Sequence, residues 1–167
     1  MRKLQLWTLA ISPFGFGYLL DSAMMRFNWY GTTLTFIGVL FYGYWYCAGY
    51  LSANWTESIT ESTLVGNSFA MVSFVLITVQ TVVVRRFMPN IVGISPQMFF
   101  LPSLRLAAQI ESVLLFFLPI RYFWATCFVS LALMVAVYRA GHKAGSNRKR
   151  GSSAFPKTPN MVDLLKR

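Results

Sequence analysis

The chain has 167 residues, of which 56% are hydrophobic, 17% are aromatic and only 12% are charged. Soluble domains carry about 25% charged residues, so this composition excludes an ordinary water-soluble domain and predicts a membrane protein. The formal net charge of +10 is concentrated towards the C-terminus, which beside apolar spans indicates contact with anionic lipid headgroups rather than nucleic-acid binding.

The first apolar segment, residues 4–20, is short for a membrane span. It is interrupted by Pro13, Gly15 and Gly17, and basic residues flank it at both ends. Cytoplasmic signals on both sides suit a segment that does not cross, so the pattern favours a re-entrant or interfacial piece over a fifth span.

A transmembrane helix is predicted over 29–51, inside a stretch without charged residues. At helical spacing, Gly31, Gly38 and Gly49 share one face of this helix. Small residues on one face allow a neighbouring helix to approach closely. We therefore predict that these glycines are helix-packing residues.

Residues 64–84 form a second uncharged run, long enough to cross a hydrocarbon core of about 30 Å. Glu57 and Glu61 precede this run, and Arg85 and Arg86 follow it. Because positive residues stay on the cytoplasmic side, the helix is predicted to run from outside to inside. The loop around Glu57 would then be external.

A stripe of small and polar residues lies along the same helix, where Gly66, Ser73 and Gln80 recur every seven residues. We predict first that this stripe packs against another helix, with each hydrogen bond between the helices contributing roughly 0.6 kcal/mol of stability. The alternative is that the stripe lines a narrow permeation path.

The next segment is interrupted by Pro89, Gly93, Pro96 and Pro102. Prolines remove backbone donors and break helices, so residues 87–102 are predicted to be a cytoplasmic loop.

A marginal third span is predicted over 98–120. Arg105, Gln109 and Ser112 form one polar face, and Glu111 lies off that face. The two charged residues cost about 5–6 kcal/mol near a helix centre, while the apolar residues recover about 3–6 kcal/mol. This segment is therefore expected to depend on protein neighbours, and Arg105, Gln109 and Glu111 are candidate intramembrane polar residues.

The last span is predicted over 122–138 and is followed by a basic tail. From Arg139 onward the composition shifts to Gly, Ser, Asn, Lys and Arg, which predicts a disordered segment containing a solvated His142. Near the end of the tail, a short helix carrying Met161, Leu164 and Leu165 is predicted to dock on a partner or a membrane.

Together these segments predict an all-α integral membrane protein. It would have about four transmembrane helices, an N-terminal re-entrant or fifth spanning segment, and a disordered basic C-terminal tail. The polytopic membrane domain would cover 1–138 and the cytoplasmic tail 139–167. The expected location is a bacterial inner membrane with the C-terminus in the cytoplasm.

No motif for catalysis, a cofactor or a metal is recognised, since the chain has one histidine and only five acidic residues, widely scattered. The expected function is therefore non-enzymatic: a subunit, assembly or regulatory factor of a larger complex of membrane proteins. A small channel, transporter or holin-like permeation protein is the alternative. Neither interpretation involves nucleic acid.

Overall fold

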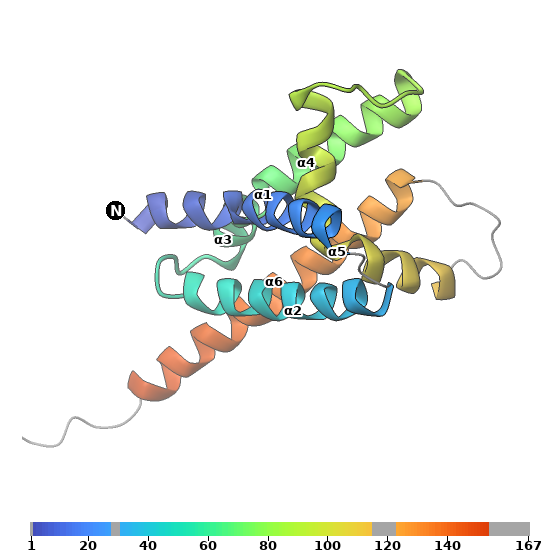
Figure 1. Cartoon of the computed structure of the whole chain (residues 1–167). Helices are drawn as coiled ribbons and strands as arrows, with labels where there is room; N and C mark the ends of the chain where they lie inside the picture. Colours follow the sequence, from blue (N-terminus) through green and yellow to red (C-terminus); the bar gives the residue numbers. More distant parts are fainter. Residues whose placement is uncertain (1, 28–30, 115–122, 154–167) are drawn as a thin grey trace, which may run out of the picture.

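The computed structural model describes residues 2–27, 31–114 and 123–153, and this part of the chain is helical (Figure 1). The prediction of an all-α protein is thus confirmed. The elements are α1 (Arg2–Arg26), α2 (Gly31–Ser52), α3 (Ile59–Gly66), α4 (Ser68–Thr78), the π-helical turn η1 (Val79–Val83), α5 (Ile91–Leu114) and α6 (Phe123–Ser153).

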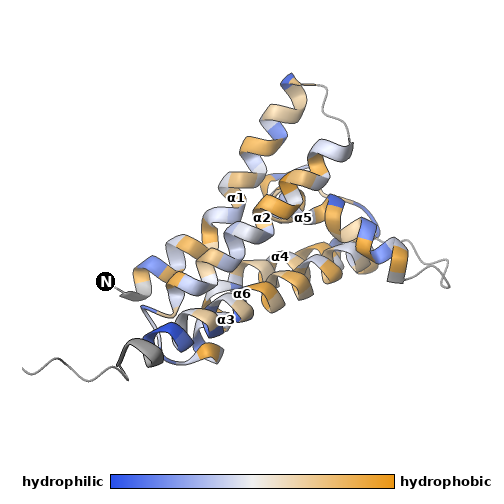
Figure 2. Ribbon diagram, turned by 90° about the horizontal axis from the view of Figure 1, so that it is seen from below, coloured by the Kyte–Doolittle hydropathy of each residue, from blue (hydrophilic) through white to orange (hydrophobic). Residues whose placement is uncertain are grey.

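Three helices are long and apolar enough to cross a membrane: Gly31–Ser52, Ile91–Val113 and Phe123–Lys149. A fourth crossing is formed if α3 and the helix after it, which meet at a bend of 49°, act as one broken span. Figure 2 shows hydrophobic residues along these helices and hydrophilic ones gathered at the last turns of α6. The chain is therefore a multi-pass membrane protein by the length and composition of its helices.

α1 is a continuous helix and does not have the broken backbone expected for a re-entrant segment. It contains Pro13, which is fully buried, and it runs antiparallel to α2. The hydroxyls of Ser12 and Tyr44 lie 2.7 Å apart, and the rings of Phe16 and Phe41 have centroids 6.4 Å apart. α1 packs mainly against α5, where Gly17 faces the Met98 carbonyl, and this packing keeps the segment helical despite its proline.

α2 and α6 pack closely and run in the same direction. Gly49 faces the backbone carbonyl of Tyr138, Gly141 faces that of Tyr46, and Gly145 faces that of Tyr50. A Cβ at any of the three glycines would collide with the backbone that it faces. The C-terminal end of α6 therefore lies beside the C-terminal end of α2.

The same end of the molecule holds the turn that connects α2 to α3, called here the 53–58 turn. The Lys149 ammonium donates a hydrogen bond to the carbonyl of Ala53 at 2.5 Å, and the Arg148 guanidinium donates one to the Tyr50 hydroxyl at 2.7 Å. The prediction that Glu57 and the basic C-terminal segment lie on opposite sides is therefore wrong.

The physical reason is that α6 begins at the end of the bundle where α4 and η1 finish, which is marked by the 84–90 turn. At the start of α5, the carbonyl of Gly93 accepts a hydrogen bond of 3.5 Å from Gln80. The start of α6 lies at the same end, where the rings of Phe87 and Phe123 have centroids 5.5 Å apart. Because α6 starts at this end, it runs opposite to the predicted direction.

The predicted loop over 87–102 is also wrong, because α5 starts at Ile91 and continues through Pro96 and Pro102. The Asn90 side chain accepts a hydrogen bond of 2.9 Å from the Gly93 amide, which satisfies a donor of the first turn. Phe99 and Phe100 are fully buried, so burial of the apolar side chains outweighs the hydrogen bonds lost at the prolines.

The tail predicted from Arg139 begins later than expected, because α6 continues to Ser153. Gly141 and Gly145 lie against α2, and His142 is 1% exposed rather than solvated. Packing on α2 therefore orders residues that the composition alone marks as disordered. The remaining tail, 154–167, lies outside the described residues.

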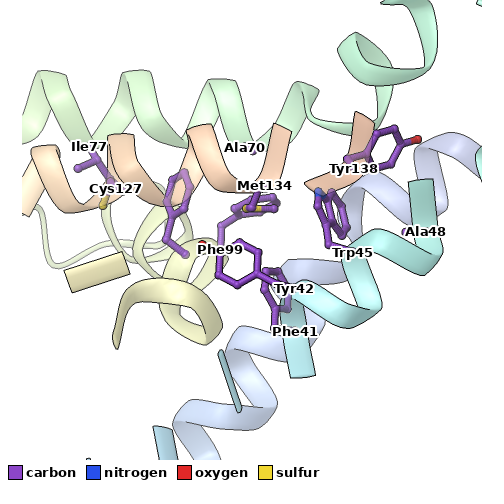
Figure 3. Packing of buried hydrophobic residues seen from close by; sticks show 11 residues of the cluster. Phe41, Tyr42, Trp45, Ala48, Ala70, Ile77, Phe99, Cys127, Met134 and Tyr138 are labelled. Carbon is purple, nitrogen blue, oxygen red and sulfur yellow. The ribbon is translucent and has the colours of Figure 1, made fainter. Parts of the chain in front are cut away.

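The core forms where α2, α4, α5 and α6 meet (Figure 3). Trp45, Phe99, Met134 and Tyr138 are all fully buried in it. Trp45 stacks on Phe41 with ring centroids 6.1 Å apart and donates a hydrogen bond of 3.2 Å to Asn67. Asn67 itself lies at the bend between α3 and α4, so Trp45 ties that bend to the core.

The relative position of the two turns can be tested with single cysteines in a Cys47→Ser, Cys127→Ala background. Glu57→Cys and Asn147→Cys should react with a membrane-impermeant maleimide from one side, and Arg86→Cys should react from the other. All three positions are exposed. Labelling of positions 57 and 147 from opposite sides of the vesicle would contradict the parallel α2–α6 pair.

The glycine contact can be tested by comparing two substitutions in α2. Gly49→Ala should lower the free energy of unfolding by about 1–3 kcal/mol, because the new Cβ would overlap the Tyr138 backbone. Gly43→Ala is the matched control, since nothing lies within 4 Å of its Cβ position, and alanine there should be neutral or slightly stabilising. Thermal unfolding in detergent measures both. Equal effects would mean that the close contact does not govern stability.

Candidate functional site

The glycines predicted to pack divide between two neighbouring helices. Cβ positions on Gly31 and Gly38 would stand 2.9 Å from Nη2 of Arg105 and 3.0 Å from Cβ of Leu106, both on α5. Gly49 faces α6, as described above. Gly66, on α3, meets the Tyr138 ring, with 2.7 Å between its Cβ position and Cζ. The single packing face predicted for α2 thus serves α5 near one end and α6 near the other.

The polar residues of the predicted stripe face the interior of the chain. Ser73 is 2% exposed and Gln80 is 3% exposed. Gln80 donates a hydrogen bond to the Gly93 carbonyl, and its Oε1 accepts one of 3.3 Å from the Met88 amide. Gln80 therefore fastens the 84–90 turn to the first turn of α5, and the structure does not place it beside Arg105.

α5 presents the predicted polar face to the outside of the bundle. Arg105, Gln109 and Ser112 are all exposed, and Oε1 of Gln109 accepts a hydrogen bond of 3.2 Å from Thr35 on α2. Arg105 also borders a groove of about 310 Å³. The other residues that line this groove are apolar except for Thr126. An arginine thus stands at the edge of an apolar surface on a helix that is itself a candidate span.

Glu111 has the opposite environment, although it lies only six positions from Arg105. It is 6% exposed, and its Oε2 accepts a hydrogen bond from the hydroxyl of Thr126 on α6. Its Oε1 is buried and has no hydrogen-bond partner within the part of the chain that the structure describes. The polar partner of Glu111 is therefore Thr126 on α6, and not Ser73 or Gln80 of the predicted stripe.

A second set of polar residues, which the sequence analysis missed, occupies the buried side of α6. Thr126, Ser130, Tyr138, His142 and Ser146 lie four residues apart, apart from a gap at Met134. The sequence shows this repeat as an i, i+4 pattern. Tyr138 is the last residue of the predicted span, and His142 lies beyond it. We call this set, together with Glu111, the α6 polar ladder.

Hydrogen bonds join the ladder to other helices. Near the 84–90 end, the hydroxyls of Ser103 and Ser130 lie 2.6 Å apart, and the Tyr42 hydroxyl donates to Ser130 at 3.5 Å. Nearer the 53–58 end, the Tyr138 and Ser62 hydroxyls lie 3.1 Å apart. Buried hydroxyls that satisfy one another in this way fix the register of the helices.

His142 lies at the 53–58 end of the ladder. Its Nδ1 is 3.4 Å from the Ser146 hydroxyl, and its Nε2 is buried without a hydrogen-bond partner among the described residues. Lys149, about two turns further along α6, is close enough to act electrostatically on the imidazole. The two buried polar atoms left unpaired in the described structure thus belong to Glu111 and His142.

The remaining predicted site residues are those of the tail. Met161, Leu164 and Leu165 lie outside the described residues, so their docking role stays a prediction. No group of three or more histidine, cysteine or acidic side chains that could hold a metal is found in residues 2–27, 31–114 and 123–153.

Comparison of the chain with models of known protein families, with curated proteins and with solved structures gives no match, so the evidence for a function comes from the chain's own geometry.

Proposed function

We propose that this protein is a non-enzymatic subunit, assembly or regulatory factor of a larger membrane complex, and that the polar face of α5 joins it to its partner. The observation that carries the proposal is the exposure of Arg105, Gln109 and Ser112 on a helix otherwise apolar enough to span a membrane.

Energetics favour a protein partner at this face. An arginine near the centre of an inserted helix costs about 2.5–3.5 kcal/mol on the insertion scale, and an exposed amide adds to that cost. Gln109 has one bond to Thr35, which leaves its amide nitrogen available to a partner. A partner helix that offers a carboxylate to Arg105 and an acceptor to Gln109 would remove both penalties.

The location and orientation follow from the distribution of charge. Arg139, Lys143, Arg148 and Lys149 belong to the part of α6 near the 53–58 end, whereas the opposite end carries Arg26, Arg85 and Arg86. With the basic tail added, the positive-inside rule places the 53–58 end and the C-terminus in the cytoplasm, in a bacterial inner membrane. The Glu57 turn would then be cytoplasmic too.

Two further contacts belong to this proposal. The basic end of α6 would lie against anionic headgroups of the cytoplasmic leaflet. The tail segment predicted to dock, with Met161, Leu164 and Leu165, would bind a cytoplasmic part of the partner. Neither contact requires a cofactor or nucleic acid.

The role of α5 can be tested by native gel electrophoresis of detergent-extracted membranes. The wild-type chain should migrate with a stoichiometric larger partner, and Arg105→Leu should release it. Truncating one partner of a desolvated charge pair costs about 2–5 kcal/mol, enough to dissociate a modest complex. Arg86→Leu, which removes an exposed arginine from the 84–90 turn, is the matched control and should keep the complex.

The opposite result has a clear meaning. If Arg105 faces lipid and reaches the headgroups, Arg105→Leu should favour insertion and leave the size of the complex unchanged. That outcome, or a wild-type chain that migrates alone, would contradict the proposal.

A further inference from the structure

An open groove of about 400 Å³ lies between α1 and α2. Both helices pack on α5 but make little contact with each other, which leaves this space along their sides. Four residues of α1 and four of α2 line the groove, and Pro102 of α5 completes the lining. Arg105 and Gln109, the residues proposed to bind a partner, are not among them, so the groove is a separate feature.

The lining of the groove is apolar. Tyr44 carries the one hydroxyl among its described lining residues, and this hydroxyl lies 2.7 Å from that of Ser12. A groove whose polar group is already paired does not select a polar ligand, but it does suit hydrocarbon. Since α2 is long and apolar enough to cross a membrane, the hydrocarbon at hand is the acyl chain of a lipid.

A basic residue and a hydroxyl mark one end of the groove. Leu19 lines the groove, and Arg26, seven residues later, lies on the same side of α1. Leu40 also lines it, and Thr33, seven residues earlier, lies on the same side of α2. Only residues 27–30 separate the two helices, so the end of α1 and the start of α2 lie at the same end of the bundle (Figure 1).

We infer that this groove binds one anionic phospholipid, with one acyl chain between α1 and α2 and with its phosphate held by Arg26 and Thr33. A helical side chain leans towards the N-terminus of its helix, so the Arg26 guanidinium extends back over the turn that contains Ala23. Ala23 lines the groove, and Arg26 is exposed. A guanidinium binds phosphate through two parallel hydrogen bonds, and a hydroxyl adds a third.

The charge at the mouth of the groove favours an anionic headgroup. Asp21 is the one acidic residue of α1, and it follows Gly17 by four positions. Gly17 faces the Met98 carbonyl of α5, so Asp21 belongs to the α5 side of the helix and not to the groove side. A zwitterionic headgroup would bring its own cation beside Arg26, whereas an anionic headgroup would not.

The length of the groove matches one leaflet of a bilayer. From Thr33 to Tyr44 the helix rises about 16 Å, and one leaflet contributes about 15 Å of hydrocarbon. Tyr44 is the last α2 residue in the lining, so a headgroup at Thr33 would place the end of its acyl chain where the groove ends. The site therefore lies in the leaflet at the 84–90 end, away from the basic turns of α6.

The headgroup contact can be tested by native mass spectrometry of the full chain in detergent. The probes are dioleoyl phosphatidylglycerol and dioleoyl phosphatidylcholine at equal concentrations. The wild type should retain one phosphatidylglycerol molecule more tightly than phosphatidylcholine. Arg26→Gln should lower the affinity for phosphatidylglycerol about five-fold and leave that for phosphatidylcholine unchanged. Arg86→Gln, which removes an exposed arginine at the same end, is the control and should lower neither affinity.

The acyl-chain contact can be tested by filling the groove. Ala23→Phe places a ring in the space for the chain and should abolish the tight binding of phosphatidylglycerol. Met25→Phe is the matched control, because Met25 is 83% exposed and does not line the groove. The control should bind the lipid like the wild type.

Should Ala23→Phe fail to fold, photolabelling of the wild type provides the second measurement. Phosphatidylglycerol with a diazirine in the middle of one acyl chain should label α1 and α2 near Ala23 and Leu40. Three results would overturn the inference: equal retention of the two lipids, equal effects of Arg26→Gln and Arg86→Gln, or labels confined to the basic turns of α6. A dimer that retains no lipid, with a second copy covering the groove, would overturn it as well.

Discussion

The close contact between α2 and α6 determines much of the remaining structure. Three glycines, Gly49, Gly141 and Gly145, let backbone lie directly against backbone, which fixes both the spacing and the parallel direction of the two helices. The parallel direction places the basic turns of α6 beside the 53–58 turn and buries His142. It also leaves α5 to fill the space at the opposite end, against α1, α2 and α4. A side chain at any of these glycines would separate the pair and remove that space.

Sequence patterns predicted the elements that depend on local composition. Long uncharged runs predicted the helical class, α2 and the apolar segment containing α4, because hydrocarbon length and hydropathy are properties of a segment alone. The predicted continuous helix over 64–84 is instead broken at Asn67, where α3 and α4 meet at a bend. The direction of α6 could not be obtained in this way. The charge rule assumes that successive apolar segments alternate in direction, whereas α6 begins beside Phe87, at the end of the bundle where α4 and η1 finish.

The same distinction between local sequence and tertiary packing applies to the site residues. The face of Arg105, Gln109 and Ser112 was predictable because it depends only on helical periodicity. The neighbours of Glu111 and His142 were not, because burial depends on which helix lies alongside. Prolines at 96 and 102 were interpreted as breakers, although burial of Phe99 and Phe100 keeps that segment helical. For α6, the sequence did contain a sign of the buried polar residues, because polar side chains recur at every fourth position. This repeat continues past the predicted end of the span.

The position of α5 also limits the order in which the bundle can be assembled. α5 packs against α1, α2, α4 and α6, and α6 follows α5 in the chain. The contacts of α5 can therefore be completed only after α6 has been synthesised.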